Sequence, residues 1–277
     1  MRRPSISGAM ARVWTVGSMV WRHGGRRVPL RLLRSRARRG GRHWCDRQVR
    51  SGAEAAFAEA DDHDQTRVVL LSGNGKSFSA GADLGWMKDQ ASLPHAENAK
   101  GADYMARMFL AIARCKKPVV GRIHGHALGG GSGLTAAVDV AISTEDCLFG
   151  MTEVKLGIVP AVISPFLLQK IGAGRARTLF LTGERFDGKE AERLGLVHRA
   201  VPVEGLDDAV GKVIKELLTA GPAAVASAKE LIRSVGHLSL EDAIPVTSKW
   251  IADLRATDEA KEGFTAFLDK RKPNWMD

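Results

Sequence analysis

Three short features of this sequence could together stabilise a negative charge that develops on an oxygen atom. They are the turn Ser79-Ala80-Gly81-Ala82-Asp83-Leu84, the triplet Gly129-Gly130-Gly131 and a single acid, Glu153. Glycine lets a ligand lie directly against the backbone, so both turns favour binding through main-chain N–H groups. A pair of such donors stabilises an enolate, and removing one typically costs about 10²–10³ in rate. The pattern therefore predicts an oxyanion site served by one carboxyl group.

The flanking segments indicate how these features are positioned. An apolar strand at 68–71 leads into the first turn, and a strand at 119–123 precedes the glycine triplet. A helical stretch at 134–137 follows the triplet, so its N-terminus directs partial positive charge at Gly130. With a further strand at 139–143, the strands and helices predict βαβ units stacked into a spiral.

Helices are predicted on both sides of this region. Residues 54–60 are typical of the end of an amphipathic helix, and 87–93 of a segment on the substrate side. Met105 and Met108 lie at helical spacing within 99–113, which favours core packing. From 206 onward the chain reads as nearly all helix. The expected N-caps are Ser164 (followed by Pro165), Asp187 (with Glu190), Ser239 (with Asp242) and Thr257.

The positive charge of the chain is confined to its start. The net charge is +10, but residues 1–50 hold 14 arginines and one acid, a balance of +13, which leaves −3 for the rest. The body therefore lacks the basic surface of a nucleic-acid-binding fold. The first 50 residues show no sustained period of two or 3.6. We interpret them either as a divergent extension or, preferably, as sequence foreign to the body, and expect no regular strand pairing onto 68–71.

Cysteine usage and hydropathy argue against three further classes of protein: disulfide-rich, metal-binding and membrane-spanning. Cys45, Cys115 and Cys147 are dispersed, so neither a disulfide framework nor a metal site is indicated, and we expect a reducing compartment. No apolar run approaches the roughly 20 residues that a membrane-spanning helix needs.

The order of the motifs resembles the enoyl-CoA hydratase/isomerase (crotonase) superfamily. The segments that carry the resemblance are 117–120 (Lys-Pro-Val-Val), 125–131 (Gly-His-Ala-Leu-Gly-Gly-Gly), 139–142, 149–153 (Phe-Gly-Met-Thr-Glu), 156–160, 181–186, 191–197 and 267–271 (Phe-Leu-Asp-Lys-Arg). The resemblance covers roughly 52–277. It implies an α/β fold, a crotonase-like spiral of ββα units with a C-terminal helical layer. Residues 1–51 are then an Arg-rich N-terminal segment without an assigned fold, and the resemblance divides the rest into a core at 52–205 and a helical trimerisation region at 206–277.

The resemblance also assigns roles to residues. It implies Glu153 as the catalytic acid/base and the N–H groups of Ala82 and Gly130 as the oxyanion hole. The implied substrate contacts are Ser79, Ala80, Asp83, Leu84, Gly129, Gly133 and Lys270. Lys270 either binds coenzyme A phosphates, as in relatives, or belongs to a solvated basic end of the chain. The substrate is then an acyl-CoA, with no separate cofactor and no metal, in a homotrimer or hexamer. The implied location is the bacterial cytoplasm, or the mitochondrial matrix of a eukaryote.

The sequence departs from the family at two places. Relatives carry a strand hairpin and an Arg-Pro-x-x-x-Asn-Ala segment near the start, and neither is identified here. Hydratases generally use a second glutamate three residues after the middle glycine of the triplet, and that position is Gly133. Two carboxylates share the activation of water and the protonation of the α-carbon, whereas one suffices to move a proton between two carbons. Isomerase and decarboxylase activities therefore stay open.

Hydratase activity is nevertheless the first interpretation. The run 153–165 (Glu-Val-Lys-Leu-Gly-Ile-Val-Pro-Ala-Val-Ile-Ser-Pro) resembles a bacterial subgroup of methylglutaconyl-CoA or related branched-chain hydratases. Two alternatives come from other classes: an acyl-CoA binder without turnover, and a nucleic-acid binder acting through the Arg-rich segment. His124 and His126 are interpreted as strand-end histidines, since Glu153 already supplies the acid/base.

Overall fold

The computed structural model describes residues 14–23, 26–35, 47–81 and 84–276. Its strands are β1 (Trp14–His23), β2 (Arg26–Ser35), β3 (Val69–Gly73), β4 (Val119–Ile123), β5 (His126–Leu128), β6 (Val140–Thr144), β7 (Leu148–Gly150), β8 (Arg185–Phe186) and β9 (Arg199–Val201). The α-helices are α1 (Arg47–Asp62), α2 (Leu84–Ala91), α3 (His95–Arg114), α4 (Gly130–Ala137), α5 (Ser164–Thr182), α6 (Gly188–Leu194), α7 (Leu206–Thr219), α8 (Pro222–Val235), α9 (Leu240–Arg255) and α10 (Asp258–Leu268). Three short 3₁₀ helices are η1 (Thr152–Leu156), η2 (Val203–Gly205) and η3 (Asn274–Met276).

A six-stranded sheet forms the centre of the molecule, in the order β1-β2-β3-β4-β6-β9. Strands β2, β3, β4, β6 and β9 run parallel to one another, which confirms the predicted parallel arrangement of the strands at 68–71, 119–123 and 139–143. A second sheet has the order β5-β7-β8. A single bridge between Ser79 and Ala127 joins the loop after β3 to this second sheet.

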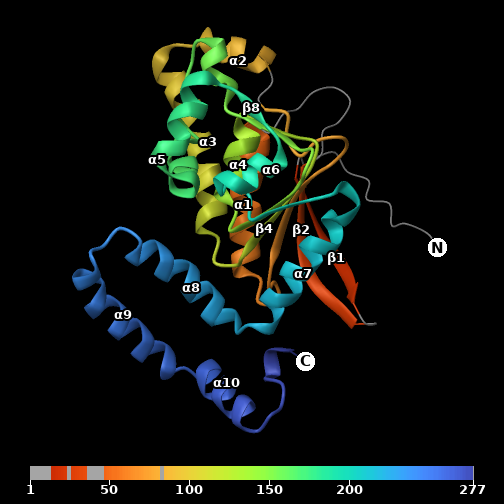
Figure 1. Cartoon of the computed structure of the whole chain (residues 1–277), viewed down its shortest axis with the longest axis vertical. Helices are drawn as coiled ribbons and strands as arrows, with labels where there is room; N and C mark the ends of the chain where they lie inside the picture. The colour runs from red at the N-terminus through yellow and green to blue at the C-terminus, as the bar shows by residue number, and fades with distance from the viewer. Residues whose placement is uncertain (1–13, 24–25, 36–46, 82–83, 277) are drawn as a thin grey trace, which may run out of the picture.

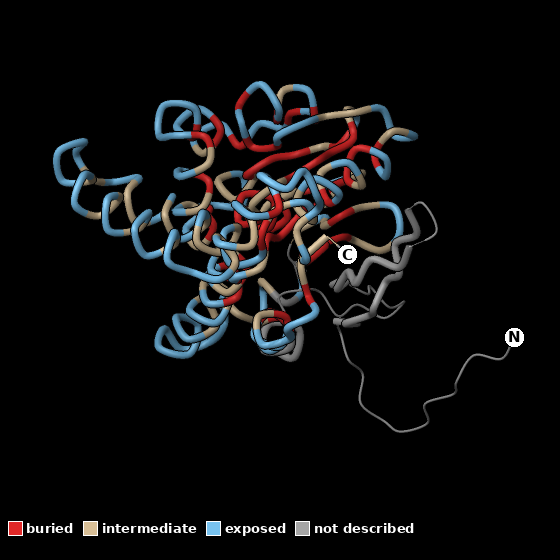
Figure 2. Tube along the Cα trace, turned by 90° about the horizontal axis from the view of Figure 1, so that it is seen from below, coloured by how far each residue is buried: buried red, intermediate tan, exposed pale blue. Residues whose placement is uncertain are grey.

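Side chains of the central strands pack on both faces of the main sheet. One strand contributes to both faces because its successive side chains point in opposite directions. Val69 and Leu71 of β3 pack into the larger core with helices α1, α3, α4 and α5. Leu70 of the same strand, with Val120 and Ile142 of the neighbouring strands, packs against α7 on the other face. Figure 2 shows the buried segments gathered in the interior between these layers.

The N-terminal segment corrects one prediction, because strand pairing reaches residues expected to stand apart. Strands β1 and β2 form an antiparallel hairpin, and β2 pairs in parallel with β3, with Arg31 opposite Val69 and Ser35 opposite Gly73. The expectation of no regular strand pairing onto 68–71 was therefore wrong. A strand adds to a sheet edge through backbone groups, which every residue but proline supplies, so a high arginine content does not prevent pairing.

Helix boundaries follow the predicted caps at three of four positions. The side chains of Asp187, Ser239 and Thr257 accept hydrogen bonds from the first turns of α6, α9 and α10. Ser164 is not an N-cap: it is the first residue of α5, and its hydroxyl donates to the carbonyl of Ala161 at 2.8 Å. Ile163 takes the cap position with helical backbone angles, so the helix begins one residue earlier than predicted.

Helices α8, α9 and α10 extend away from the layered body (Figure 1). They carry large apolar side chains that are exposed in this single chain, namely Ile232, Leu240, Ile244, Phe264, Phe267 and Leu268. Among the described residues, no helix combines the length and the apolar character needed to cross a membrane.

Candidate active site

Two loops lie side by side at one end of the main sheet and form the base of the site. The N–H of Phe78 donates to the carbonyl of His124 at 2.8 Å, and that of Ser79 donates to the carbonyl of His126 at 2.9 Å. Gly125 makes this approach possible: a Cβ atom there would be 2.0 Å from the carbonyl oxygen of Lys76. The predicted first turn is thereby fixed beside the strand that leads to the glycine triplet.

The glycine triplet forms the start of α4. Gly129 is its N-cap, with φ of 52°, and its N–H donates to the carbonyl of Gly150 at 2.8 Å. Gly130 is the first helical residue, and N–H groups at that position have no acceptor within the helix. Gly131 allows close packing, because a Cβ atom there would be 2.6 Å from the carbonyl oxygen of Ser79. The helix N-terminus therefore lies against the first turn, as the sequence predicts.

Glu153 lies in η1, directly beside this helix N-terminus. Its Oε1 would be 3.1 Å from a Cβ atom at Gly129. Its Oε2 is buried and has no hydrogen-bond partner among the described residues. Burial raises the pKa of Glu153, opposed only by a hydrogen bond from its own backbone. A buried carboxyl with a free oxygen and a raised pKa is suited to exchange protons with a ligand.

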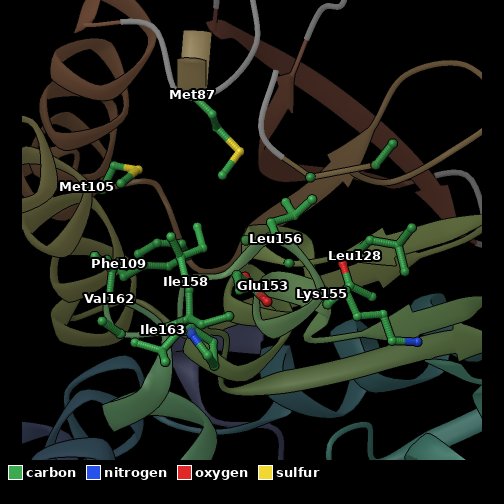
Figure 3. Close-up of a pocket in the computed structure, with 18 of the residues that line it drawn as sticks. Met87, Met105, Phe109, Leu128, Glu153, Lys155, Leu156, Ile158, Val162 and Ile163 are labelled. Carbon is green, nitrogen blue, oxygen red and sulfur yellow. The ribbon is translucent and has the colours of Figure 1, made fainter. Parts of the chain in front are cut away.

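A cavity of about 510 Å³ contains this carboxyl group. Most of its lining is apolar and comes from α2, α3, the end of η1 and the segment after it: Met87, Met105, Phe109, Leu156, Ile158, Val159, Pro160, Ala161, Val162 and Ile163. The polar side chains among the described lining residues are Thr152, Glu153, Lys155 and Arg185. In Figure 3, Glu153 lies between Phe109, Val162 and Ile163 on one side and Lys155 and Leu128 on the other. The volume is typical of a small-molecule site.

The predicted site residues are only partly brought together. Ala80, Gly129, Gly130 and Glu153 line the cavity. Ala82 and Asp83 lie outside the described residues, and Leu84 is the first residue of α2. Ser79 is not among the lining residues; its hydroxyl is buried without a partner in the described part of the chain. Lys270 is exposed beyond α10 and does not line the cavity of this chain.

Gly133, the position of the second glutamate in the resemblance, is filled by neighbouring side chains. A Cβ atom there would be 2.3 Å from Cγ2 of Ile163 and 3.1 Å from Cε1 of Phe109. Phe109 is fully buried and Ile163 nearly so, and both line the cavity. The place of a second carboxyl is therefore taken by an apolar wall.

Several lining residues were missed or read differently from the sequence. Met108 belongs to the core, as predicted, but Met105, three residues earlier on α3, lines the cavity. Arg185 is brought in by β8, whose two-residue length leaves little sequence signal. His124 and His126 bond to the carbonyl of Gly75 and the hydroxyl of Ser77 and lie outside the cavity lining, in agreement with a strand-end role.

Neither a metal site nor a disulfide is found in the described part of the chain. No group of three or more His, Cys, Asp or Glu side chains there could hold a metal ion. Cys115 and Cys147 are free and buried, and burial raises the pKa of each thiol to about 12. Cys45 lies outside the described residues.

The parallel sheet, the glycine triplet at the start of α4 and the buried carboxyl group of Glu153 agree with the superfamily that the motifs resemble. A family model described as enoyl-CoA hydratase/isomerase matches residues 46–277, and the chain belongs to this family.

Individual relatives agree with this assignment. A crotonyl-CoA hydratase of Syntrophomonas wolfei is 33% identical over 224 residues, which are 80% of this chain and 85% of that protein. A peroxisomal Δ(3,5)-Δ(2,4)-dienoyl-CoA isomerase of Arabidopsis thaliana is 31% identical over 231 residues, covering 79% and 83%. The crystal structure of an enoyl-CoA hydratase from Shewanella pealeana superposes with a TM-score of 0.83 at 35% identity, covering 89% of this chain and 92% of that one. The crotonase fold predicted from the motifs is thus confirmed.

Proposed function

We propose that this enzyme adds water to the double bond of a 2-enoyl-CoA and that Glu153 is its acid/base. The observation that carries the proposal is the buried Oε2 of Glu153, which has no partner among the described residues and lies beside the N-terminus of α4. The solved and curated relatives named as hydratases support water as the second reactant. The substrate is the thioester itself, so no additional cofactor is required.

One carboxyl group can complete the reaction by handling the same proton twice. Ionised Glu153 takes a proton from water while the water oxygen bonds to the β-carbon, and the electrons of the double bond pass to the thioester oxygen. The N–H groups of Gly130 and Ala82 stabilise this enolate. Glu153 then returns the proton to the α-carbon. Both new bonds therefore form on the face of the substrate that Glu153 approaches.

We propose that the acyl chain is branched, with methylglutaconyl-CoA as the model substrate. The run 153–165 supports this through its resemblance to such hydratases. The wall formed by Ile163 and Phe109 supports it too, because an alkyl branch gains from contact with apolar surface that a carboxylate would otherwise occupy.

A second candidate is movement of the double bond, as in an enoyl-CoA isomerase. The single carboxyl among the described lining residues favours it, as does the identity with the plant dienoyl-CoA isomerase. The two activities are separated by incubating the enzyme in ¹⁸O-labelled water with a 2-enoyl-CoA and, separately, with a 3-enoyl-CoA. Mass spectrometry should find ¹⁸O in a 3-hydroxyacyl-CoA. Conversion of the 3-enoyl to the 2-enoyl thioester without oxygen uptake would instead establish an isomerase.

We further propose a homotrimer or a hexamer of the chain. The exposed side chains of Leu240, Phe267 and Leu268 support it, because a large apolar surface on a projecting arm is costly in water. Light scattering coupled to size-exclusion chromatography tests this directly, and a monomer would refute it.

A further inference from the structure

We infer that Lys155 and Arg185 bind an anionic group at the far end of the acyl chain, so that the preferred substrate is a 2-enoyl-CoA with a distal carboxylate. This inference rests on the proposed function, since it assigns residues and a substrate class to the same cavity. It concerns specificity and leaves the acid/base role to Glu153.

The first observation is that both cations line the cavity without a partner. No hydrogen bond or ion pair joins the ammonium of Lys155 or the guanidinium of Arg185 to any residue that the structure describes. Some other surface cations are paired, for example Arg193 with Glu190, Arg271 with Glu262 and Lys189 with Glu145; unpaired ones among the described residues, such as Lys212, lie outside the cavity lining. Positive charge that faces a concave, largely apolar surface attracts an anionic ligand.

The second observation is that the two cations share one wall. Arg185 lies opposite Gly150 in the β7–β8 pair, and its Cγ would be 3.2 Å from a Cβ atom at Gly150. Cγ and Cε of Lys155 would each be 3.3 Å from a Cβ atom at Gly183, two residues before Arg185. Because Gly150 and Gly183 have no side chains, the aliphatic parts of Arg185 and Lys155 can lie flat against the backbone there. This contact supports the aliphatic parts and leaves the two charged groups available to a ligand.

The third observation is that Lys155 and Arg185 do not stabilise the ionised form of Glu153. The pKa of Glu153 is raised by burial, and only its own backbone hydrogen bond opposes the shift, so neither cation lowers it. Glu153 also lies between Lys155 and the apolar side chains Phe109 and Ile163 (Figure 3). A substrate that reacts at Glu153 thus has an apolar wall on one side and a cationic wall on the other. An acyl chain with an apolar body and a carboxylate end matches both.

A phosphate of coenzyme A is the other oxyanion that such a pair could bind, and matched ligands separate the two. Glutaconyl-CoA and 2-pentenoyl-CoA have the same chain length and the same double bond, and only the first carries a distal carboxylate. The variants are Lys155→Met, Arg185→Met and the double variant, since methionine keeps much of each stem. Lys212→Met is the control, because Lys212 is an exposed lysine of α7 outside the cavity lining.

The quantity measured is the ratio of kcat/KM for glutaconyl-CoA to kcat/KM for 2-pentenoyl-CoA. We expect each single variant to lower this ratio about 10- to 100-fold, the effect of losing one hydrogen bond to a charged group, and the control to leave it unchanged. A ratio that stays constant in the double variant would overturn the inference. So would an equal loss of affinity for free coenzyme A, which would assign the cations to a phosphate.

Binding of the unreactive pair glutaryl-CoA and pentanoyl-CoA, measured by calorimetry, keeps the test independent of turnover. A preference for glutaryl-CoA that disappears in the double variant supports the inference even if the enzyme adds no water to an enoyl-CoA. Those two results together would refute the proposed hydratase activity and leave the proposed carboxylate site standing. Binding of pentanoyl-CoA also reports that each variant is folded.

Discussion

Glu153 and Gly129 lie against each other, with Oε1 of the acid 3.1 Å from the position that a Cβ atom would take at Gly129. Gly129 is also the N-cap of α4, and its φ of 52° is unfavourable for residues with a side chain. One residue therefore controls both the start of the helix that provides the Gly130 N–H and the space beside the carboxyl group.

Gly129→Ala should lower both stability and turnover. A left-handed conformation costs a residue with a side chain about 1–3 kcal/mol, and the added methyl group would displace Glu153. We expect kcat to fall at least tenfold. Gly172→Ala is the matched control, because Gly172 has φ of 75° and nothing within 4 Å of its Cβ position. Both variants should lose stability in denaturant unfolding, but only Gly129→Ala should lose turnover; equal kcat values would contradict the argument.

Glu153→Gln should lower turnover by at least about 10²-fold while nearly preserving affinity for a thioester. A positioned acid/base contributes about 10²–10⁴-fold, whereas an amide of the same shape keeps the packing. The measurements are kcat on a 2-enoyl-CoA and the Kd of a saturated acyl-CoA. A variant with most of its activity would remove Glu153 from the mechanism.

The raised pKa of Glu153 makes a separate prediction about stability. The folded protein holds this proton more tightly than the unfolded chain does, so the contribution of Glu153 to stability is fully present below its ordinary pKa of 4.5 and is lost as pH rises through the folded-state value. A glutamine side chain at this position cannot ionise and avoids this loss. We therefore expect Glu153→Gln to have a higher Tm than the parent at pH 7.5, with the difference shrinking towards pH 4. A difference that grows in acid would show that Glu153 is stabilised in its ionised form.

Gly133→Glu should destabilise the fold and should not improve hydration. Its Cβ would lie 2.3 Å from Cγ2 of Ile163, and overpacking of a core typically costs about 1–3 kcal/mol. Adding Ile163→Ala removes Cγ2, the nearest atom in conflict, and leaves the Cβ of residue 163 at 2.8 Å, so the double variant should recover part of the free energy lost. Denaturant unfolding of the two single variants and the double variant gives the coupling, and strictly additive losses would mean that Ile163 does not fill this position.

The glycine turns and Glu153 could be predicted from the sequence because close backbone approach requires glycine and leaves it visible at fixed spacing. The strands at 119–123 and 139–143 were found because buried parallel strands are continuous apolar runs. Of the apolar cavity walls, the sequence indicated only the segment at 87–93, from which Met87 lines the cavity. Arg185 enters through a strand of two residues, and Met105 differs from the core residue Met108 only in the direction its side chain takes on α3. Such placements depend on tertiary packing, which no local pattern records.

The N-terminal hairpin supports the last prediction, which replaces the interpretation of residues 1–50 as sequence foreign to the body. Strand β2 covers the edge of β3 through five paired positions, from Arg31 with Val69 to Ser35 with Gly73. Removing residues 1–35 would leave that edge unpaired, and an open edge strand is both less stable and prone to pair with other chains. We expect the truncated protein to show a lower Tm and to aggregate faster on heating than the full chain. An Arg-specific protease should likewise cleave after Arg31 and Arg34 far more slowly in the folded protein than in urea. Rapid trimming to a fragment that begins near Gly52, with Tm and turnover unchanged, would show that the hairpin contributes nothing to the fold.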